Sequence, residues 1–545
     1  MKALYRVLLT LVLTNVPLGI SATERVGEAI RRQLEYAGEP AAIHIGDDVV
    51  YASHALPAFY ERRGFAPAWS SAGRFERRAR KLLETIREVE AEGLRPSDYH
   101  LDALVAGLEA SAPGVEDLAA TDLLLTDAFL ILAAHIVSGR VDPATFEPEW
   151  IATRREVDVA ALLEDVVAGD GVRKTLRELR PDHAGYERLV KALSRYREIA
   201  SRGGWPLIGP GPSLKPGTTD PAVAVLRRRL TIAGDYRGGE AAEPDRYDDS
   251  LVEATVRFQQ RHGLEDDGVV GPKTREALDV SAARRARLIE LNLERWRWLP
   301  QELGDRYILV NVPGFDLRVS ESGEEVLAMR VVVGRAMRRT PVFSDVMRYL
   351  VFSPSWEVPP TILRLDKLPE IRKNPNYAIE QNFRVFQLGD GRWTEVNPLE
   401  VEWSRATAAT IRLRQRPGPN NALGLAKFMF PNAFNVYLHD TPSRELFARS
   451  QRDFSSGCVR VEKPAELAYY LLHDDPAWTR EAVVAAMESG QERSVTLPRP
   501  IAVHIEYWTA WVEAGGVVQF RRDIYGRDAR LDAALKLPPP SEPEE

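Results

Sequence analysis

The stretch Phe454-Ser455-Ser456-Gly457-Cys458-Val459-Arg460-Val461 carries the only cysteine of this 545-residue chain. One cysteine cannot close a disulfide within the chain, and it cannot build a cysteine-based zinc site. Cys458 is therefore either an inert residue or a reactive thiol. The small residues before it allow the backbone to approach a ligand closely. Arg460 lies two residues further on, and a nearby positive charge favours the nucleophilic thiolate.

A histidine precedes Cys458 by nineteen residues. His439 ends the segment 434–439, whose apolar and aromatic residues predict a strand. A histidine at a strand end opposite a cysteine loop can take the thiol proton and later protonate a leaving amine. Spacing alone leaves two interpretations open, a catalytic Cys–His pair and two residues without chemistry.

The surrounding sequence predicts a β-rich domain. Short β-branched segments separated by turn signals occur at 307–312, 315–319, 326–333, 349–352, 500–512 and 517–520. From about 359 to 427 the pattern changes to loop and helix, and so long an interruption is typical of a lid or cap. A helix opened by Pro464 follows Cys458. We therefore predict a domain over 305–530 with an inserted cap over about 359–427.

The N-terminal part of the chain has helical periodicity instead. Residues 23–205 predict a helical scaffold domain, which ends at a cluster of Gly and Pro. A small three-helix module follows over 206–280, and helix returns over 281–304 as part of the scaffold or a linker. Residues 531–545 end in a Pro- and Glu-rich run and predict a disordered tail. The fold class is multidomain α+β.

Charge and hydropathy limit the possible partners and compartment. The net charge is −7 and the pI is near 5.9, which argues against general nucleic-acid binding. At the start, Lys2 and Arg6 precede an apolar run over 7–16, and small residues follow, which is the order of a secretory signal over 1–22. No later segment reaches about 18 consecutive apolar residues, so we expect an exported protein with no transmembrane span in its mature form.

The stretch around Cys458 resembles the catalytic signature of the L,D-transpeptidase (YkuD-type) family. That family has a histidine, a gap, then Ser/Thr-His-Gly-Cys with a polar or basic residue two positions on. Here Ser456 stands where many members have a second histidine, so His439 is the only histidine within reach of the motif.

Residues 206–280 resemble the peptidoglycan-binding module of wall-modifying enzymes. The residues that carry this resemblance are Val223, Leu226, Leu230, Phe258, Gln259, Gly263-Leu264, Asp267-Gly268, Gly271 and Thr274. Whether such a module binds peptidoglycan or only spaces the domains stays open. The order of scaffold, module and capped catalytic domain is similar to the large periplasmic, YcbB-like subfamily.

The resemblance implies a role for each residue of the candidate site. Cys458 would be the nucleophile and His439 the general base and acid. The backbone of Gly457 would serve the oxyanion hole, together with the Cys458 N–H, or would orient His439, and the Ser456 backbone would also orient His439. Substrate would be bound by Arg460, Ser455, Tyr437 and Arg452, with a surface charge as the alternative for Arg452. No cofactor and no metal is implied.

The implied reaction is 3→3 crosslinking of peptidoglycan in the periplasm of a Gram-negative bacterium, in the service of wall biogenesis and cell shape. Tetrapeptide stems would be both donor and acceptor, and cell wall synthases are conceivable partners. Three alternatives remain: an L,D-carboxypeptidase with water as acceptor, attachment of a lipoprotein through a lysine, and a non-catalytic wall-binding scaffold.

Overall fold

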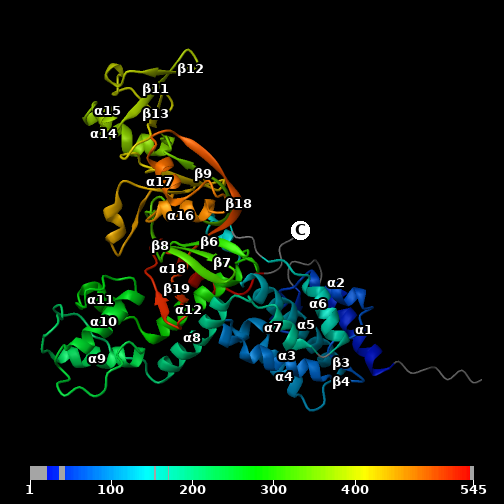
Figure 1. The fold of residues 1–545 in the computed structure, drawn as a ribbon. Helices are drawn as coiled ribbons and strands as arrows, with labels where there is room; N and C mark the ends of the chain where they lie inside the picture. The colour runs from blue at the N-terminus through cyan, green and yellow to red at the C-terminus, as the bar shows by residue number, and fades with distance from the viewer. Residues whose placement is uncertain (1–20, 36–42, 152–154, 170, 541–545) are drawn as a thin grey trace, which may run out of the picture.

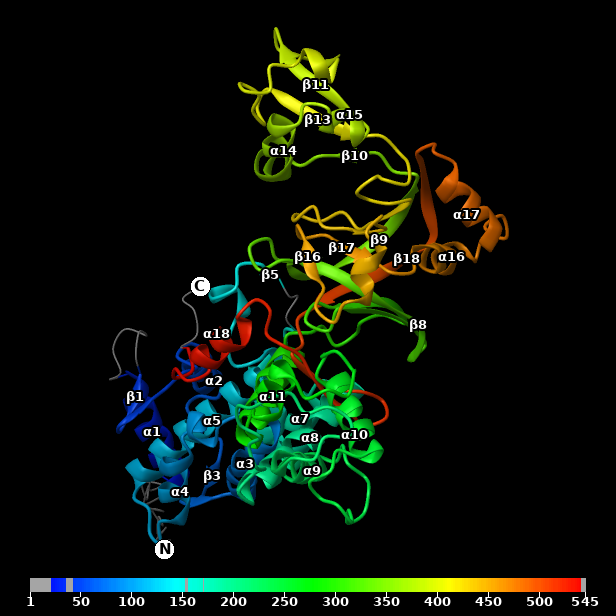
Figure 2. The ribbon, with the colours of Figure 1, turned by 90° about the vertical axis from the view of Figure 1, so that its left-hand side faces the viewer.

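The molecule is elongated, with its parts arranged along one axis (Figures 1 and 2). The computed structural model describes residues 21–35, 43–151, 155–169 and 171–540. The N-terminal helices and the three-helix module lie at one end, the main β domain lies in the middle, and a small β subdomain lies at the far end. Residues 1–20 of the predicted signal (1–22) and the last five residues of the predicted tail lie outside the described residues.

The N-terminal domain is a bundle built around one apolar helix. The helices are α1 (Ala22–Glu35), α2 (Ala55–Arg62), α3 (Arg77–Glu88), α4 (Leu101–Glu109), α5 (Val115–Ser138), α6 (Val159–Ala168), α7 (Val172–Glu178) and α8 (Ala184–Ser201). Two short hairpins complete it, β1–β2 (His44–Ile45, Asp48–Val49) and β3–β4 (Ser70–Ser71, Arg74–Phe75).

Helix α5 is buried on nearly all sides, as expected of a helix that is hydrophobic all round. Of the helices in the described residues, it alone has the length and hydropathy that could cross a membrane, but 89% of that apolar window is buried inside the fold. Its buried Asp122 accepts hydrogen bonds from the Tyr60 hydroxyl at 2.7 Å and from the Ala68 N–H at 2.7 Å. These bonds compensate the carboxylate for lost water and fix α2 and the following loop on α5.

The small module contains α9 (Pro221–Ala233), α10 (Asp249–Arg261) and α11 (Pro272–Leu278). Its core uses the apolar stripes visible in the sequence, and the buried Gln259 amide secures the turn between α10 and α11. Gln259 donates to Asp267 Oδ1 and to the Val269 carbonyl, both at 3.0 Å, and accepts from the Gly268 N–H at 2.9 Å.

The module is packed firmly against the end of the chain. Helix α12 (Ala282–Arg297) returns to pack on α8, and the hairpin β19–β20 (Ala510–Val512, Val518–Phe520) lies beside it. The buried His262 ring stacks on Phe258 at 3.8 Å and on Phe520 at 5.6 Å, measured between ring centroids. Arg521 also donates to the Arg261 carbonyl at 3.0 Å. The module is thus held by stacked rings as well as by its linkers.

The central sheet closes on itself. Its strands follow the order β14-β15-β17-β8-β7-β6-β18-β9, and β14 also pairs with β9, which completes a ring. The bounds are β6 (Arg306–Asn311), β7 (Asp316–Glu321), β8 (Glu324–Gly334), β9 (Val342–Phe352), β14 (Ala426–Met429), β15 (Leu438–His439), β17 (Val459–Val461) and β18 (Arg493–Glu506). Beside this ring, β16 (Asp453–Ser455) pairs with β8 and β5 (Trp150–Ile151) with β9, while α16 (Pro464–Leu472) and α17 (Arg480–Glu488) cover the sheet.

The inserted cap contains a sheet that the sequence interpretation missed. Loop and helix were expected, but β10, β13, β11 and β12 pair in that order, with helices beside them. Their bounds are β10 (Trp356–Glu357), β11 (Phe383–Gly389), β12 (Arg392–Val396), β13 (Ile411–Gln415), α13 (Pro360–Ile362), the π-helical turn η4 (Leu363–Lys367), α14 (Leu368–Lys373) and α15 (Tyr377–Glu380). The strands alternate buried apolar residues with exposed Arg and Gln, and that charge obscured the strand pattern.

The predicted disorder from residue 531 is wrong for the first ten residues. Helix α18 (Arg527–Ala534) buries Leu531, and Leu535 also packs into the core. The Leu535 carbonyl accepts a hydrogen bond from Arg140 at 3.1 Å, and the Leu537 carbonyl accepts one from Arg95 at 3.1 Å. The Pro- and Glu-rich composition predicted disorder, and the burial of Leu531 and Leu535 and the long-range hydrogen bonds could not be predicted from it.

A buried carboxylate connects the scaffold to the C-terminal segment. The Glu147 side chain is 1% exposed and meets Arg530 at 2.8 Å, Arg527 at 3.4 Å and Arg339 at 3.6 Å. We expect Glu147→Gln to destabilise the protein by about 3 kcal/mol, because the buried Arg527 would keep only the half-exposed Glu149 as a charged partner. Chemical denaturation monitored by tryptophan fluorescence measures this. The matched control is Glu149→Gln, since Glu149 is 46% exposed and only 3.5 Å from Arg527; an equal loss in both variants would contradict the expectation.

Candidate active site

Three neighbouring strands place the candidate residues on one face of the sheet. In the register, Lys427 of β14 is opposite His439 of β15, and His439 is opposite Arg460 of β17. Paired residues on adjacent strands project to the same side, and so do residues two apart on a strand. Tyr437 and Cys458 therefore lie next to this row on the same face, one step before His439 and Arg460. The structure thus brings together the predicted Cys458, His439, Tyr437 and Arg460.

His439 is buried and is held by a backbone carbonyl. Its Nδ1 lies 2.5 Å from the carbonyl oxygen of Asp440. A carbonyl can only accept, so Nδ1 carries the proton and Nε2 of the neutral ring is free to accept one. The prediction that the Ser456 or Gly457 backbone orients this ring is not what the structure shows, because the adjacent Asp440 carbonyl is already within reach.

The pKa of His439 is lowered to about 3. Burial is the largest cause, and the positive charges of Arg460 and Lys427 add to it, against the opposing effect of the Asp440 carbonyl. The imidazole is therefore neutral at every physiological pH, which is the form that a general base requires.

Asp440 is secured by its own hydrogen bonds. Its carboxylate accepts from the Leu425 N–H at 2.9 Å and from Arg444 Nη2 at 2.6 Å. Gly424 makes this approach possible: its φ is +60°, and a Cβ there would lie 2.4 Å from the Asp440 carboxylate. The carbonyl that holds His439 thus depends on a glycine fifteen residues earlier in the chain.

The Cys458 thiol is half-buried and uncharged at rest. Burial raises its pKa, while hydrogen bonding to Tyr437 and the charges of Lys427 and Arg460 oppose that rise. The sulfur lies 3.9 Å from the Asn435 carbonyl. No direct hydrogen bond joins the described side chains of Cys458 and His439. Tyr437 lies beside both: its ring centroid is 5.7 Å from that of His439, and it opposes the rise in the pKa of Cys458.

The loop before Cys458 is held from inside. Ser455 Oγ accepts from the Gly457 N–H at 3.1 Å and donates to the Cys458 carbonyl at 2.5 Å. The expected oxyanion role of the Gly457 N–H therefore conflicts with this structure, since that donor is occupied. The Cys458 N–H has no partner among the described residues and remains the available donor. Ser455 supports the loop, and its hydroxyl is turned to backbone groups.

Thr340, in the loop between β8 and β9, also fixes the loop before Cys458. Its buried hydroxyl donates to the Gly457 carbonyl at 2.8 Å and accepts from the Gly334 N–H at 2.9 Å. The Tyr525 hydroxyl in turn accepts from the Thr340 N–H at 3.1 Å and donates to the Gly334 carbonyl at 2.5 Å. The sequence interpretation missed both residues, because the bonds span 117 and 185 positions of the chain.

Ser456 contacts the cap. Its hydroxyl accepts from Arg338 Nη1 at 2.9 Å, and Arg338 Nη2 lies 2.9 Å from Asp366 Oδ1 in the π-helical turn η4. Arg335 reaches the same serine at 3.4 Å. This chain of contacts couples the residue that stands in place of the second histidine to the inserted cap.

The two predicted arginines differ in their surroundings. Arg452 donates to the carbonyls of Val331, Arg449 and Phe315 at 3.2, 2.5 and 3.0 Å, so it braces the backbone. Neither substrate binding nor a solvated charge describes it. Arg460 is different: its buried Nε has no hydrogen-bond partner among the described residues. Arg460 can thus receive an anionic group.

Lys427 was also missed in the sequence. Its Nζ lies 4.0 Å from the centroid of the Tyr437 ring, and the side chain is half-buried. The signal was present in the alternation of Ala426-Lys427-Phe428-Met429, where a lysine occupies one face of a strand. Only the pairing of β14 with β15 shows that this face holds His439.

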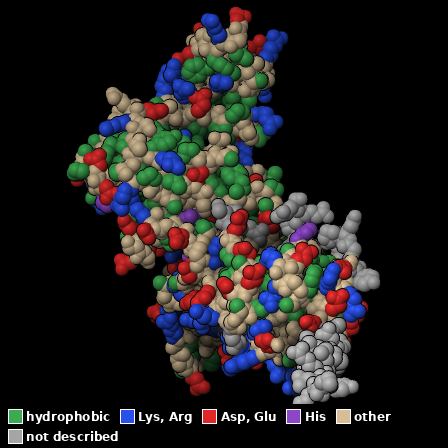
Figure 3. Space-filling view, turned by 90° about the vertical axis from the view of Figure 1, so that its right-hand side faces the viewer, with side chains coloured by type: hydrophobic (Ala, Val, Ile, Leu, Met, Phe, Trp, Pro, Cys, Tyr) green, Lys and Arg blue, Asp and Glu red, His purple; other side chains and the backbone are tan. Residues whose placement is uncertain are grey.

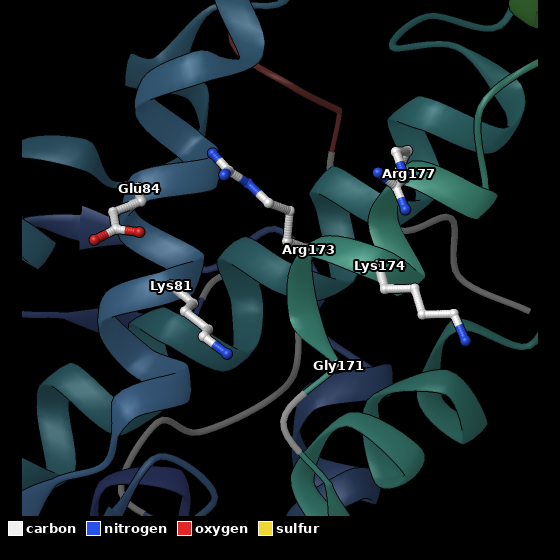
Figure 4. A pocket seen from close by; sticks show the side chains of 6 residues that line it. All are labelled: Lys81, Glu84, Gly171, Arg173, Lys174 and Arg177. Atoms are coloured by element: carbon white, nitrogen blue, oxygen red, sulfur yellow. The ribbon is translucent and has the colours of Figure 1, made fainter.

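A groove of about 330 Å³ exists on the scaffold, away from this site (Figure 4). Lys81 and Glu84 project from α3, and Arg173 projects from α7 toward α3. Arg173 pairs with Glu88.

On the face seen in Figure 3, apolar side chains are frequent over the upper part of the molecule, which holds the sheet and cap, and charged side chains are more frequent over the lower part.

We expect Thr340→Val to slow the reaction of Cys458 with iodoacetamide by about tenfold, because the Gly334 N–H and the Gly457 carbonyl would both lose a buried partner, at about 1–3 kcal/mol for each unsatisfied group. Mass spectrometry of the full chain measures the rate, since one cysteine takes the label. Thr340→Ser keeps the hydroxyl and should restore the rate. An unchanged rate in the valine variant would exclude this role.

Three family models match separate parts of the chain. They are a scaffold domain over residues 54–193, a "Putative peptidoglycan binding domain" over 219–278, and the L,D-transpeptidase catalytic domain over 305–479. The last range contains His439, Cys458, Lys427 and Arg460. The resemblance predicted from the sequence is confirmed by these matches, and so is the multidomain α+β fold class.

Relatives support the same assignment. A Haemophilus influenzae protein described as "Putative L,D-transpeptidase" is 36% identical over 247 residues, which are 45% of this chain and 49% of that protein. The alignment thus spans about half of the relative. Solved L,D-transpeptidases from Xylanimonas cellulosilytica and Stackebrandtia nassauensis match at 16% and 13% identity, with TM-scores of 0.19 and 0.22; they cover 55% and 54% of this chain and 100% and 94% of their own chains. By the family-model matches, residues 305–479 resemble the L,D-transpeptidase catalytic domain, and the segments before them match a scaffold domain and a putative peptidoglycan-binding domain.

Proposed function

We propose that this protein is a peptidoglycan L,D-transpeptidase that forms 3→3 crosslinks through a thioester on Cys458. The observation that carries the proposal is the pairing of a lone, half-buried thiol with a neutral histidine on the same face of adjacent strands, within the segment that matches the family's catalytic domain. The division of the chain into a scaffold (23–205), a module (206–280) and a capped catalytic domain (305–530) belongs to the same proposal.

In the first half-reaction Cys458 attacks the donor stem. The sulfur bonds to the carbonyl between the third residue, a diamino acid, and the terminal D-Ala, and the thiol proton passes to His439 Nε2. Negative charge develops on the carbonyl oxygen, where the Cys458 N–H is the available donor. The C–N bond then breaks, His439 returns its proton to the leaving D-Ala amine, and a thioester remains.

In the second half-reaction an amine replaces the sulfur. The side-chain amine of a second stem's diamino acid attacks the thioester, and His439 takes its proton. The C–S bond breaks, and the Cys458 thiolate that leaves receives this proton from His439. The acceptor and donor are then joined by an amide, and Cys458 is free again. The His439 ring and thiol have to approach each other for these transfers, and such contacts often tighten only when substrate binds.

Two further parts support the reaction. Arg460, whose Nε is unpaired, suits a substrate carboxylate. The peptidoglycan-binding module would bring the enzyme to the wall, and both domains place the activity outside the cytoplasm. We extend this to the periplasm of a Gram-negative bacterium because the chain resembles the large periplasmic, YcbB-like subfamily and begins with the signal pattern over 1–22. Partner synthases remain part of the expectation from the sequence.

The reaction products test the function. The full chain, incubated with disaccharide-tetrapeptide, should release D-Ala and form dimers that mass spectrometry detects. Cys458→Ala should abolish both, and His439→Gln should lower the rate by at least about a hundredfold, the range attributed to acid–base catalysis. Tripeptide without dimer would replace the transpeptidase by an L,D-carboxypeptidase. Retained binding to wall sacculi with no products from the unaltered protein would leave only a binding scaffold.

The cap contact predicts how the acceptor is chosen. Water competes with the acceptor amine for a thioester, and a closed cap excludes it. We expect Asp366→Asn to weaken the link to Arg338 and to raise the ratio of tripeptide to dimer about threefold, which corresponds to about 0.7 kcal/mol. The control is Asp390→Asn, at an exposed turn of the cap hairpin β11–β12. An identical ratio in both variants would remove Asp366 from acceptor selection.

A further inference from the structure

Lys427 holds a positive charge beside the reacting pair without an obvious structural use. Its ammonium forms no ion pair within 4.0 Å and no hydrogen bond among the described residues, although the side chain is half-buried. Burying a cation is unfavourable unless something compensates it. What the structure offers is the face of the Tyr437 ring, 4.0 Å from Nζ to the centroid.

The position of Lys427 is fixed by the sheet. It pairs directly with His439 across β14 and β15, and β14 is also paired with β9 on its other side, so neither neighbour of the strand is free to move away. The Tyr437 ring under the ammonium lies two residues before His439, next to Cys458, which lies two residues before Arg460 in the paired strand. Lys427 therefore contacts a ring that lies between it and the thiol loop.

We propose that Lys427 is a charge that serves the reaction at a distance: its ammonium stabilises the Cys458 thiolate. The proposal rests on the function proposed above for the identity of the reaction, but the effect of Lys427 on the thiol does not depend on that function. Lys427 touches neither substrate nor sulfur in this arrangement, so it is a positioning charge and not a catalytic residue. Tyr437 serves as the platform that keeps the ammonium in place.

The charges around the thiol support this assignment. Cys458 faces Lys427 on β14, Tyr437 on the segment before β15, and Arg460 on β17. The negative charge of Glu492 also acts on Lys427 and raises its pKa. The Glu492 carboxylate itself accepts a hydrogen bond from the Ser355 N–H at 2.7 Å. Arg460 and Lys427 thus flank the pair from opposite sides. With one of them removed, a buried thiolate would lose half of its nearby positive charge.

The only cysteine of the chain makes the test direct. Iodoacetamide modifies the thiolate, and the rate across about pH 6 to pH 11 gives the midpoint of thiol ionisation. We expect Lys427→Met to move this midpoint up by about one pH unit, in the range that a nearby opposite charge produces. Lys427→Arg should stay near the unaltered protein because it keeps the charge.

The matched control is Lys463→Met. Lys463 follows β17 closely, but its Nζ donates to the Ala328 carbonyl at 3.1 Å and lies outside the row. Its midpoint should not move. If Lys427→Met loses its fold by circular dichroism, Lys427→Gln repeats the measurement with a polar side chain of similar length.

The outcomes separate this proposal from others. An unchanged midpoint in the folded neutral variants overturns it, and if KM for tetrapeptide then rises instead, Lys427 binds a substrate carboxylate. A midpoint that moves equally in Lys463→Met would show a general charge effect and would also overturn it. Alkylation needs no substrate, so a shifted midpoint would stand even if no crosslinks form.

Discussion

The desolvation of His439 is the constraint on which the rest of the site depends. At rest, burial and the charges of Lys427 and Arg460 keep the imidazole neutral, so it is available as a base. Because the ring is not charged, it needs no carboxylate partner, and a carbonyl oxygen suffices to select its tautomer. The same burial raises the pKa of the Cys458 thiol, which delays ionisation until substrate and the flanking cations favour it.

Much of this arrangement was predictable because it is local. The short strands before 352, the helix opened by Pro464 and the stripes of the three-helix module follow from periodicity and turn residues. Cys458 and His439 could be paired because a strand end and a glycine-containing loop are recognisable in sequence. The expectation of a cap followed from the length of the interruption, even though its sheet was missed.

The remainder could not be predicted because it depends on register between distant segments. Lys427 gains its meaning only when β14 pairs with β15, and Thr340 only when the loop after β8 meets the cysteine loop. Arg452 was expected to bind substrate because its charge is evident in the sequence. The three backbone carbonyls that accept its hydrogen bonds are evident only in the structure. For the same reason the Ser456 backbone was expected to orient His439, whereas the Asp440 carbonyl holds that ring.

The end of the chain has a consequence for the order of assembly. Arg140 belongs to the scaffold, yet one of its buried donors is satisfied by the Leu535 carbonyl, 395 positions later. Strand β6 likewise waits for β18, its parallel partner from the last tenth of the chain. A scaffold that emerges first during synthesis would therefore contain polar groups without hydrogen-bond partners until the last segment is made. Premature termination would leave both the scaffold and the central sheet without partners that the C-terminal segment supplies.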